Sequence, residues 1–266
     1  MRVGIIGLGL MGGSLALALH RARPGLRLVG HDPDAATMRR ALSLGVVEEG
    51  DLRAVDVLFL AVPIAALPDV LAGLRGHRGV VTDLASTKAH VMRSAAAAGV
   101  DLVGGHPMCG REQSGIEAAD PDIFAGAPWV LTRDEPIVTD LVRAVGAWPV
   151  YLDAERHDRL VAGVSHAAFA VSAAYVLALA GDADWEAMQL VAGTGFRDMT
   201  RLAAGDPDLY ASIASTNREH LLEALRTIEA SLARLRSHLE AGDDRLVELF
   251  EEAREQRERW ARSPCR

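Results

Sequence analysis

The feature that most constrains this chain is a glycine-rich loop, Gly7-Leu-Gly-Leu-Met-Gly12, which follows a short apolar run at 2–6 and opens a helical pattern at 11–23. In this context the first glycine allows a tight turn, the second lets a pyrophosphate approach the backbone, and the third lets the helix pack on the strand. The unpaired N–H groups and the dipole of the helix start also attract phosphate. The loop therefore predicts a Rossmann-type dinucleotide site, although a purely structural glycine turn stays open as the alternative. Cofactor contacts are expected from Gly7, Gly9, Leu10, Met11 and Gly12.

A carboxylate at the end of the second apolar run indicates which dinucleotide is bound. Asp32 lies 20 residues beyond Gly12, where it would accept hydrogen bonds from the adenosine ribose hydroxyls and repel a 2′-phosphate. No Arg or Lys directly follows it, so NAD is expected rather than NADP. A role for Asp32 as a simple turn or N-cap residue before Pro33 stays open. Val62 and Pro63, which follow the third run, are also expected beside the cofactor.

Over the first 150 or so residues, short runs rich in Val, Leu and Ile alternate with helical patterns. This alternation is typical of a doubly wound parallel sheet with helices on its faces, in which strands are buried on both sides. Strands are expected at 2–6, 27–31, 55–61, 80–83 and 102–104, with two more near 129–131 and 150–152 that finish the sheet. Helices are expected at 11–23, 34–44, 64–74 and 87–98, with N-cap roles suited to Asp34 and Ser86.

Beyond Asp153 the chain has helical patterns only, at 155–180, 184–203, 207–241 and 243–262. We therefore expect an α/β dinucleotide-binding domain at 1–153 and an all-helical substrate and dimerisation domain at 154–266. Apolar residues recur at spacings of three and four on a charged background, which would bury one face against another helix. They are Leu221, Leu222, Leu225, Ile228, Leu232, Leu235 and Leu239. A partner subunit could supply that helix and give a homodimer, and packing within one chain is the alternative.

The composition excludes several classes of protein. A net charge of −8 argues against nucleic acid as a partner, because binding phosphates requires a surplus of positive charge. The two cysteines, Cys109 and Cys265, are far apart and predict neither a disulfide framework nor a metal site. The chain begins with Arg2-Val-Gly-Ile-Ile-Gly and shows no secretory signal pattern, so a reducing, cytoplasmic location is expected.

One segment meets the length criterion for a membrane span. Residues 161–180 carry no charged side chain, but alanine is the most frequent residue among them, and polar residues such as Ser165, His166 and Ser172 interrupt the run. Acidic helices of soluble character follow. We therefore expect a buried helix here, and no membrane partner.

Polar clusters follow two of the predicted strands, where parallel sheets bind their ligands. They are Asp83-Leu-Ala-Ser86-Thr-Lys88 and Gly105-His106-Pro-Met-Cys-Gly110, and a third motif, Gly193-Thr-Gly-Phe-Arg-Asp198-Met-Thr-Arg201, lies in the helical region. Together they closely resemble the prephenate and arogenate dehydrogenase family, from Gly4 to about Asn217. The resemblance implies oxidative decarboxylation of prephenate to 4-hydroxyphenylpyruvate with NAD, in tyrosine biosynthesis. Activity on arogenate, alone or in addition, is the alternative.

The resemblance also implies roles for single residues. His106 matches the histidine that takes the substrate hydroxyl proton as hydride leaves, and capping of the loop before Pro107 is its alternative role. Ser86 matches a serine that orients this histidine or the hydroxyl, a role compatible with a helix N-cap. Arg201 matches the residue that binds the ring carboxylate, where a guanidinium can donate two parallel hydrogen bonds, and a surface salt bridge is its alternative.

Further substrate contacts are less firmly placed by the motifs. Asp198 could steady Arg201 or link subunits. Many family members carry the pattern S-H-x-x-H, whereas Ser165-His166-Ala-Ala-Phe169 keeps only His166 as a substrate-binding candidate. Arg111 is a candidate replacement for the missing histidine, and a simple ion pair with Glu112 is the other possibility.

Two other classes of protein fit the sequence less well. A β-hydroxyacid dehydrogenase needs a lysine in its helical domain, but Lys88, the only lysine here, lies in the first domain, where it either steadies the Ser86 loop or is exposed. A non-catalytic NAD sensor would have decayed substrate motifs, yet Ser86, His106 and Arg201 are all present.

Overall fold

A computed structural model of the chain describes residues 1–262, so Cys265 lies outside the described residues. The first part is a five-stranded parallel sheet of order β2-β1-β3-β4-β5. Its strands are β1 (Arg2–Ile6), β2 (Arg27–His31), β3 (Val57–Leu60), β4 (Val80–Asp83) and β5 (Leu102–Val103). The predicted α/β fold with a doubly wound parallel sheet is confirmed.

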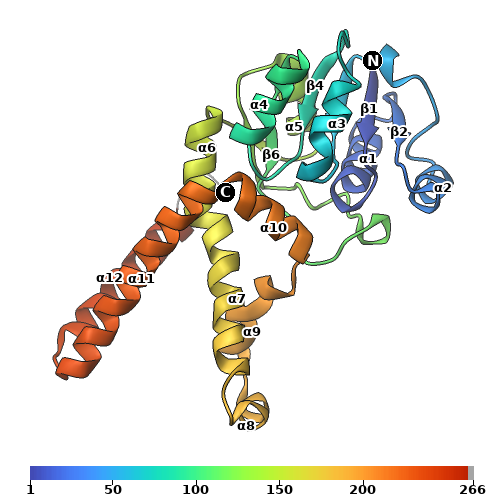
Figure 1. Cartoon of the computed structure of the whole chain (residues 1–266). Helices are drawn as coiled ribbons and strands as arrows, with labels where there is room; N and C mark the ends of the chain where they lie inside the picture. Colours follow the sequence, from blue (N-terminus) through green and yellow to red (C-terminus); the bar gives the residue numbers. More distant parts are fainter. Residues whose placement is uncertain (263–266) are drawn as a thin grey trace.

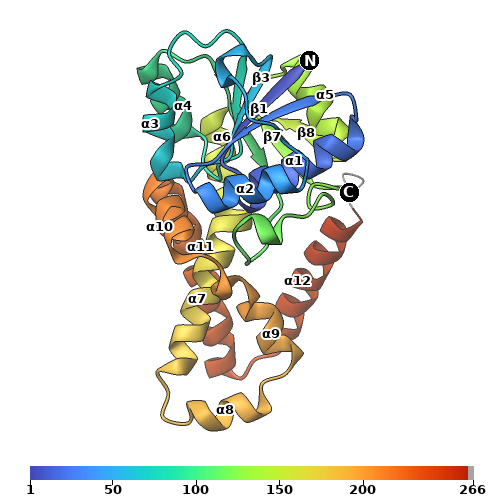
Figure 2. The same ribbon diagram turned by 90° about the vertical axis from the view of Figure 1, so that its right-hand side faces the viewer.

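Helices cover both faces of this sheet because its strands are apolar on both sides. The helices are α1 (Leu10–Ala22), α2 (Ala35–Ser43), α3 (Leu67–Ala72), α4 (Ala89–Ala98) and α5 (Pro136–Ala144). Alternate residues of a strand point to opposite faces. Phe59 accordingly belongs to the core shared with α1, α2 and α5, while Leu58 and Leu60 belong to the core shared with α3 and α4. Figure 2 shows α3 and α4 on one side of the strands and α1 and α5 on the other.

The carboxyl ends of the central strands are level with one another. Ile6 pairs with Leu60, and Leu60 pairs with Asp83. The segments that follow β1, β3 and β4 therefore leave the sheet at one edge, where ligands bind in sheets of this kind.

A second sheet differs from the sequence expectation. The strands β6 (Gly105–Pro107), β7 (Pro128–Leu131) and β8 (Trp148–Tyr151) form a separate sheet in which β6 runs antiparallel to β7. The strands expected near 129–131 and 150–152 exist, but they join β6 and do not finish the parallel sheet. The expectation missed β6 because Gly and Pro are depleted in strands, and it also missed α5 between β7 and β8.

The remainder of the chain is helical, as expected. A continuous helix consists of α6 (Ala154–Val161), a π-helical turn η4 (Ala162–His166) and α7 (Ala167–Ala180). It is followed by α8 (Trp185–Val191), α9 (Thr194–Thr200), the 3₁₀ turn η5 (Arg201–Ala204), α10 (Pro207–Thr216), α11 (Arg218–Ala241) and α12 (Arg245–Ala261). The helix expected at 184–203 is interrupted at 192–193, and the one expected at 207–241 is interrupted at Asn217.

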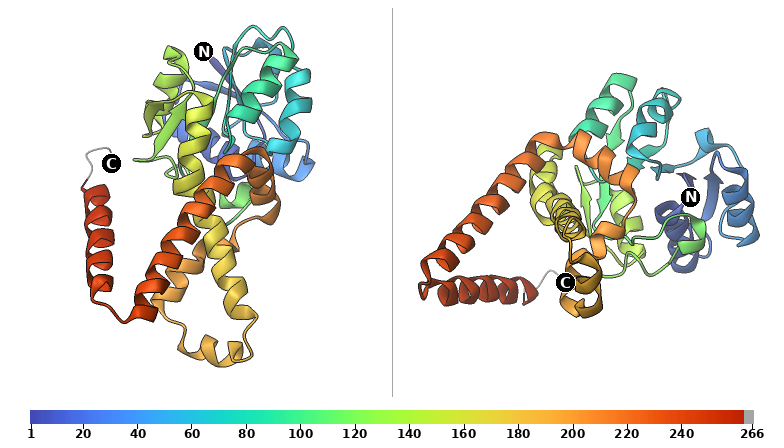
Figure 3. Two further views of the ribbon diagram at one scale, coloured as in Figure 1. Left: turned by 60° about the vertical axis from the view of Figure 1, so that its left-hand side comes forward. Right: turned by 60° about the horizontal axis from the view of Figure 1, so that its bottom comes forward.

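The helical part contacts the sheet domain through α6 and α10, and its other helices extend away from it. Ile213 of α10 is buried in the core beside α3 and α4. The hairpin of α11 and α12 forms one arm, and α7 with α8 and α9 forms another (Figure 1). Two further views show the same divergent arms (Figure 3).

Many apolar side chains of these arms are exposed in the single chain. Leu177, Leu190, Leu239 and Phe250 are 72%, 88%, 65% and 61% exposed. By length and composition, helix 154–180 could cross a membrane. Only 28% of its most apolar stretch is buried within the chain. The expected burial of residues 161–180 is thus wrong for the isolated chain, because no other element of the chain covers most of this helix.

Gly105 is a position where the fold has no room for a side chain. A Cβ atom there would lie 2.3 Å from the carbonyl oxygen of Asp83. We expect Gly105→Ala to lower the free energy of unfolding by about 1–3 kcal/mol, the usual effect of overpacking, measured by urea denaturation. Gly110→Ala in the same loop is the control, because a Cβ there would meet nothing within 4 Å. Equal stability of the two variants would contradict the close approach of β6 to β4.

Candidate active site

The glycine-rich loop has the geometry that a pyrophosphate needs. Gly7 has a φ of +87°, and a Cβ on Gly12 would lie 1.8 Å from the Gly7 carbonyl oxygen. Neither residue can therefore carry a side chain. A Cβ on Gly9, in contrast, would meet nothing within 4 Å. Gly9 is the N-cap of α1, so no side chain caps the first N–H groups of this helix. The loop thus offers open space in front of free backbone donors, which fits an anionic dinucleotide.

Asp32 lies against this loop at the end of β2. Its Oδ2 accepts a hydrogen bond from Leu8 N at 2.7 Å, and its Oδ1 accepts one from Asp34 N at 2.9 Å. The second bond is the turn contact that the sequence left open, whereas the N-cap of α2 is Asp34, as predicted. Val62 packs beside Gly7, because a Cβ on Gly7 would lie 3.1 Å from Cγ1 of Val62. Pro63, the next residue, is exposed. The residues proposed for the cofactor therefore gather at one edge of the sheet.

His106 lies on β6 and is 7% exposed. Its Nδ1 is 2.8 Å from Nε2 of His157, whose Nδ1 is 2.7 Å from Oδ1 of Asp158. Sequence reasoning missed His157 and Asp158, both buried on α6. The only signal in the sequence was an adjacent His-Asp pair at the start of the helical region. His157 is 51 residues from His106 in sequence, although the fold brings the two rings together.

The surroundings of His106 keep its imidazole neutral. Burial lowers its pKa well below the usual value of histidine, and the nearby His157, Lys88 and His166 lower it further. A neutral imidazole has one nitrogen free to accept a proton. The prediction that His106 acts as a base is therefore chemically feasible here.

A buried ion pair between Lys88 and Asp83 joins the two substrate motifs. Both side chains are fully buried, and Lys88 Nζ also donates a hydrogen bond to the Gly105 carbonyl oxygen at 2.6 Å. Asp83 Oδ1 accepts a hydrogen bond from Gly105 N at 3.0 Å. Of the two roles left open for Lys88, exposure is wrong, and the side chain instead ties β6 to the end of β4.

The proposed N-cap role of Ser86 is wrong. Helix α4 begins at Ala89, three residues later, and the backbone N–H groups of Lys88 and Ala89 donate to the Asp158 carboxylate at 2.7 and 2.9 Å. The cap of α4 thus comes from α6. Within the described residues the Ser86 hydroxyl makes no hydrogen bond to His106.

His166 is buried in the π-helical turn, close to the same group of residues. Its Nδ1 is 3.2 Å from Nδ2 of Asn217, which also donates to the Asp158 carbonyl oxygen at 2.7 Å. Burial lowers the pKa of His166 to about 4, so the ring is neutral. Because Asn217 supplies a donor to Nδ1, the ring proton lies on Nε2, which is buried near the backbone of Ser86.

Arg201 borders a cavity of about 470 Å³ between α9 and the loop after β6. In the single chain its guanidinium forms an ion pair with Glu112, which is the salt bridge that the sequence left open as an alternative. Asp198 is exposed and makes no ion pair with Arg201 within the part of the chain that the structure describes. Arg111 pairs with Asp120 and not with Glu112.

The position of the missing second histidine is occupied by an aromatic stack. Phe169 of α7 lies against Tyr210 of α10, with ring centroids 3.2 Å apart and planes at 6°. The Tyr210 ring therefore covers the side chain that replaces the histidine donor.

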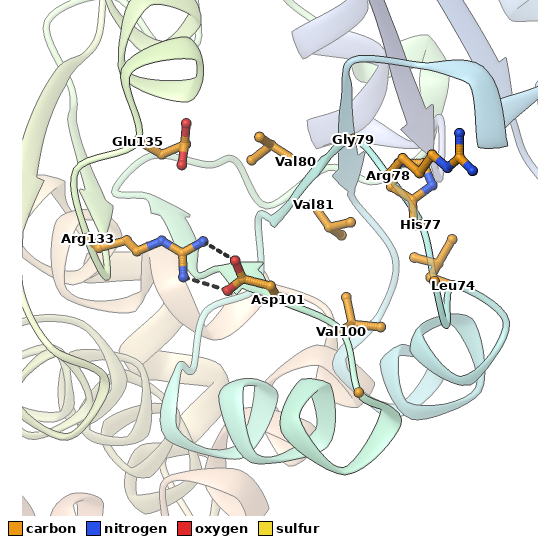
Figure 4. Close-up of a pocket in the computed structure, with 12 residues that line it drawn as sticks. Leu74, His77, Arg78, Gly79, Val80, Val81, Val100, Asp101, Arg133 and Glu135 are labelled. Atoms are coloured by element: carbon orange, nitrogen blue, oxygen red, sulfur yellow. Dashed lines mark hydrogen bonds and ion pairs between the residues drawn. The ribbon is translucent and has the colours of Figure 1, made fainter.

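Another cavity, of about 350 Å³, lies at the opposite edge of the parallel sheet. Residues at the start of β4 and β5 line it, and Arg133 donates to both carboxylate oxygens of Asp101, at 2.6 and 2.9 Å (Figure 4). Because ligands of such sheets bind at the carboxyl ends of the strands, this cavity is separate from the site around His106. Among the described residues, no cluster of His, Cys, Asp and Glu could hold a metal ion.

Comparisons with known proteins cover nearly the whole chain. Residues 15–147 match the family model "Prephenate dehydrogenase, nucleotide-binding domain", and residues 153–252 match "Prephenate dehydrogenase, dimerization domain". The chain is 31% identical to a prephenate dehydrogenase of Lactococcus lactis subsp. cremoris, over 96% of this chain and 76% of that protein.

Solved structures are similar over the same extent. Arogenate dehydrogenase of Synechocystis has a TM-score of 0.83 at 30% identity, over 98% of this chain and 100% of that one. Prephenate dehydrogenase of A. aeolicus, in complex with hydroxyphenyl propionate and NAD⁺, has a TM-score of 0.89 at 28% identity, over 97% and 98% of the two chains. On the two family models and these similarities, the chain belongs to the prephenate dehydrogenase family.

Proposed function

We propose that the protein oxidises and decarboxylates prephenate to 4-hydroxyphenylpyruvate with NAD, as a step of tyrosine biosynthesis. The observation that carries this proposal is a buried, neutral His106 at the ligand-binding edge of a dinucleotide-binding sheet. The family membership and the bound ligands named for the A. aeolicus structure support it.

The protein's own part in this reaction is the movement of one proton and the positioning of two ligands. NAD, when bound, accepts the hydride from the hydroxyl-bearing carbon of the substrate ring. His106 takes the hydroxyl proton as the carbonyl forms. Loss of carbon dioxide then returns the electron pair to the ring, which becomes aromatic, and the new phenol oxygen regains a proton. Aromatisation drives the reaction, so orientation is the main task left to the protein.

Cofactor selection follows from the carboxylate beside the glycine-rich loop. Asp32 uses one lone pair on each oxygen for Leu8 N and Asp34 N. The remaining lone pairs can accept hydrogen bonds from the ribose hydroxyls, and the negative charge disfavours a 2′-phosphate.

Substrate binding is proposed to centre on Arg201. The ring carboxylate would replace or share its present partner, Glu112, and receive two parallel hydrogen bonds. Ser86 and the Nε2 of His166 are proposed as further polar contacts to the substrate. Arg111 and Asp198 are kept as candidates for its side-chain end.

Arogenate is the second candidate substrate, and the Phe169–Tyr210 stack favours it as a side activity. Phe169 provides no donor for the side-chain carboxylate of prephenate and no positive charge against the ammonium of arogenate. Both effects narrow the difference in binding free energy between prephenate and arogenate. We retain prephenate as the preferred one.

The assembly is proposed to be a soluble, cytoplasmic homodimer. The exposed apolar side chains of α7, α8, α11 and α12 require a cover, and a second copy of the helical domain supplies one with two-fold symmetry. The family name of residues 153–252, a dimerization domain, supports this arrangement.

The function is tested by prephenate-dependent formation of NADH. Replacing His106 with Asn should lower kcat by roughly two to four orders of magnitude, the usual contribution of a positioned base, and leave NAD affinity nearly unchanged. Arogenate is assayed in parallel. A wild-type protein inactive on both substrates would refute the function, and an H106N kcat within about threefold of wild type would remove His106 from the mechanism.

Substrate binding is tested at Arg201. Arg201→Gln should raise KM for prephenate at least about tenfold, equivalent to about 1.4 kcal/mol, because the ring carboxylate loses its charged hydrogen-bond donor. The expected loss of binding energy is modest, since Arg201 is exposed and solvent screens its charge. Arg23→Gln is the matched control, because it removes an exposed, ion-paired arginine outside the proposed site. An unchanged KM in R201Q would show that the ring carboxylate is bound elsewhere.

Assembly is tested by light scattering at micromolar concentration. The wild-type mass should be twice the 28.3 kDa of one chain. Leu177→Glu, in the uncharged helix, should weaken the dimer, whereas Leu44→Glu, at an exposed leucine of the first domain, should not. A monomeric wild-type protein would contradict the proposal.

A further inference from the structure

His157 has no part in the function proposed so far, although it is the immediate neighbour of the proposed base. It is fully buried, and each ring nitrogen has one partner: His106 Nδ1 at 2.8 Å and Asp158 Oδ1 at 2.7 Å. The imidazole rings of His106 and His157 are close, with centroids 5.1 Å apart. The three side chains therefore form an uninterrupted row that starts on β6 and ends on α6.

The direction of each hydrogen bond in this row follows from Asp158. Burial raises the pKa of its carboxyl group, but the hydrogen bond from His157 and those from the backbone of Lys88 and Ala89 lower it more, so the net shift is downward. Asp158 is thus an ionised carboxylate, which only accepts hydrogen bonds. Nδ1 of His157 must donate to it, and neutral His157 is left with an accepting Nε2.

The same reasoning fixes the protonation of His106. Because Nε2 of His157 accepts, Nδ1 of His106 must carry a proton and donate it. Neutral His106 then has an unprotonated Nε2. This nitrogen is the atom that can take the substrate hydroxyl proton.

We propose that His157, supported by Asp158, is a positioning residue that fixes His106 in the tautomer with an unprotonated Nε2 and stabilises the cation formed when His106 takes the substrate proton. The proposal rests on the proposed function of His106. When Nε2 of His106 gains the proton, its Nδ1 proton can shift toward His157, so that the positive charge moves next to Asp158. No proton leaves the row, and the shift reverses when the proton returns to the product.

Other charged groups around the row do not replace this stabilisation. The Lys88 ammonium is paired with Asp83, so its charge is largely compensated. His166 is neutral and is held by Asn217 on the side of α11. Asp158 is therefore the carboxylate in direct contact with the histidine pair.

The pair should also determine the acid limb of the pH profile. Protonation of the pair places a proton on Nε2 of His106 in either arrangement of the charge, and the enzyme is then inactive. With His157 present, Asp158 favours the cation. The repulsion by which His157 lowers the pKa of His106 requires a charged His157, so it opposes a second proton on the pair and not the first. With Gln at position 157 the cation must stay on His106, whose burial lowers its pKa, so the acid limb moves to lower pH.

The test compares His157→Gln with wild type in kcat and in the pH dependence of kcat/KM. Gln retains an acceptor for His106 and fills a similar volume, and His77→Gln, at a histidine on the opposite edge of the sheet, is the matched control. We expect H157Q to lower kcat roughly ten- to a hundredfold, to shift the acid limb to lower pH and to leave NAD binding unchanged. A lowered kcat with an unmoved acid limb would overturn the proposal.

Two further measurements test the row, and the second of them uses only the wild-type protein. Adding H157Q to H106N should cost no further activity, because residues that act as a unit are not additive, and an additive loss would overturn the proposal. Nitrogen NMR of the unliganded wild-type protein above neutral pH should show a protonated Nδ1 in His106, and a protonated Nε2 would overturn it. The NMR result stands even if neither prephenate nor arogenate is turned over, which separates the failure of this inference from that of the proposed function.

Discussion

The site depends on one buried carboxylate, that of Asp158. It accepts hydrogen bonds from the backbone of Lys88 and Ala89 at the start of α4 and from the ring of His157. A buried charge is tolerated only when it is paired and its lone pairs are used, and here all the donors come from other parts of the site. The carboxylate therefore joins α6 of the helical part to α4 of the sheet part. Without it, two helix N–H groups and one imidazole would be left unsatisfied in the interior.

The sequence predicted the parts of the fold that local patterns determine. The glycine-rich loop, the five parallel strands and the Asp34 cap each depend on neighbouring residues, and each was predicted close to its position. What it missed depends on contacts between distant segments. Strand β6 has little strand propensity and exists because Lys88 and Asp83 hold Gly105 against the end of β4. Such a contact leaves no periodic trace in the sequence.

The candidate site divides in the same way. His106 and Arg201 were predicted from motifs, whereas His157 was missed because an adjacent His-Asp pair on an amphipathic helix has no distinctive spacing. The expected cap at Ser86 failed for a related reason, since the donors at the start of α4 are satisfied by Asp158 on a different helix. The expected burial of helix 161–180 failed because that face has no cover within a single chain. In all three cases the deciding contact is far away in sequence or absent from the single chain.

These contacts give the two ends of the proposed substrate different surroundings. The proton-accepting end is held by buried groups from both parts of the chain, with Lys88 and Asp83 fixing β6, and His157 fixing the ring of His106. The proposed carboxylate-binding end is an exposed Arg201 whose ion pair with Glu112 can open at little cost. Rigidity is needed where a proton and a hydride must leave in a defined geometry, because small displacements there cost rate. It is not needed where a charged group is only bound, so in the proposed site Arg201 can change partner while His106 stays in place.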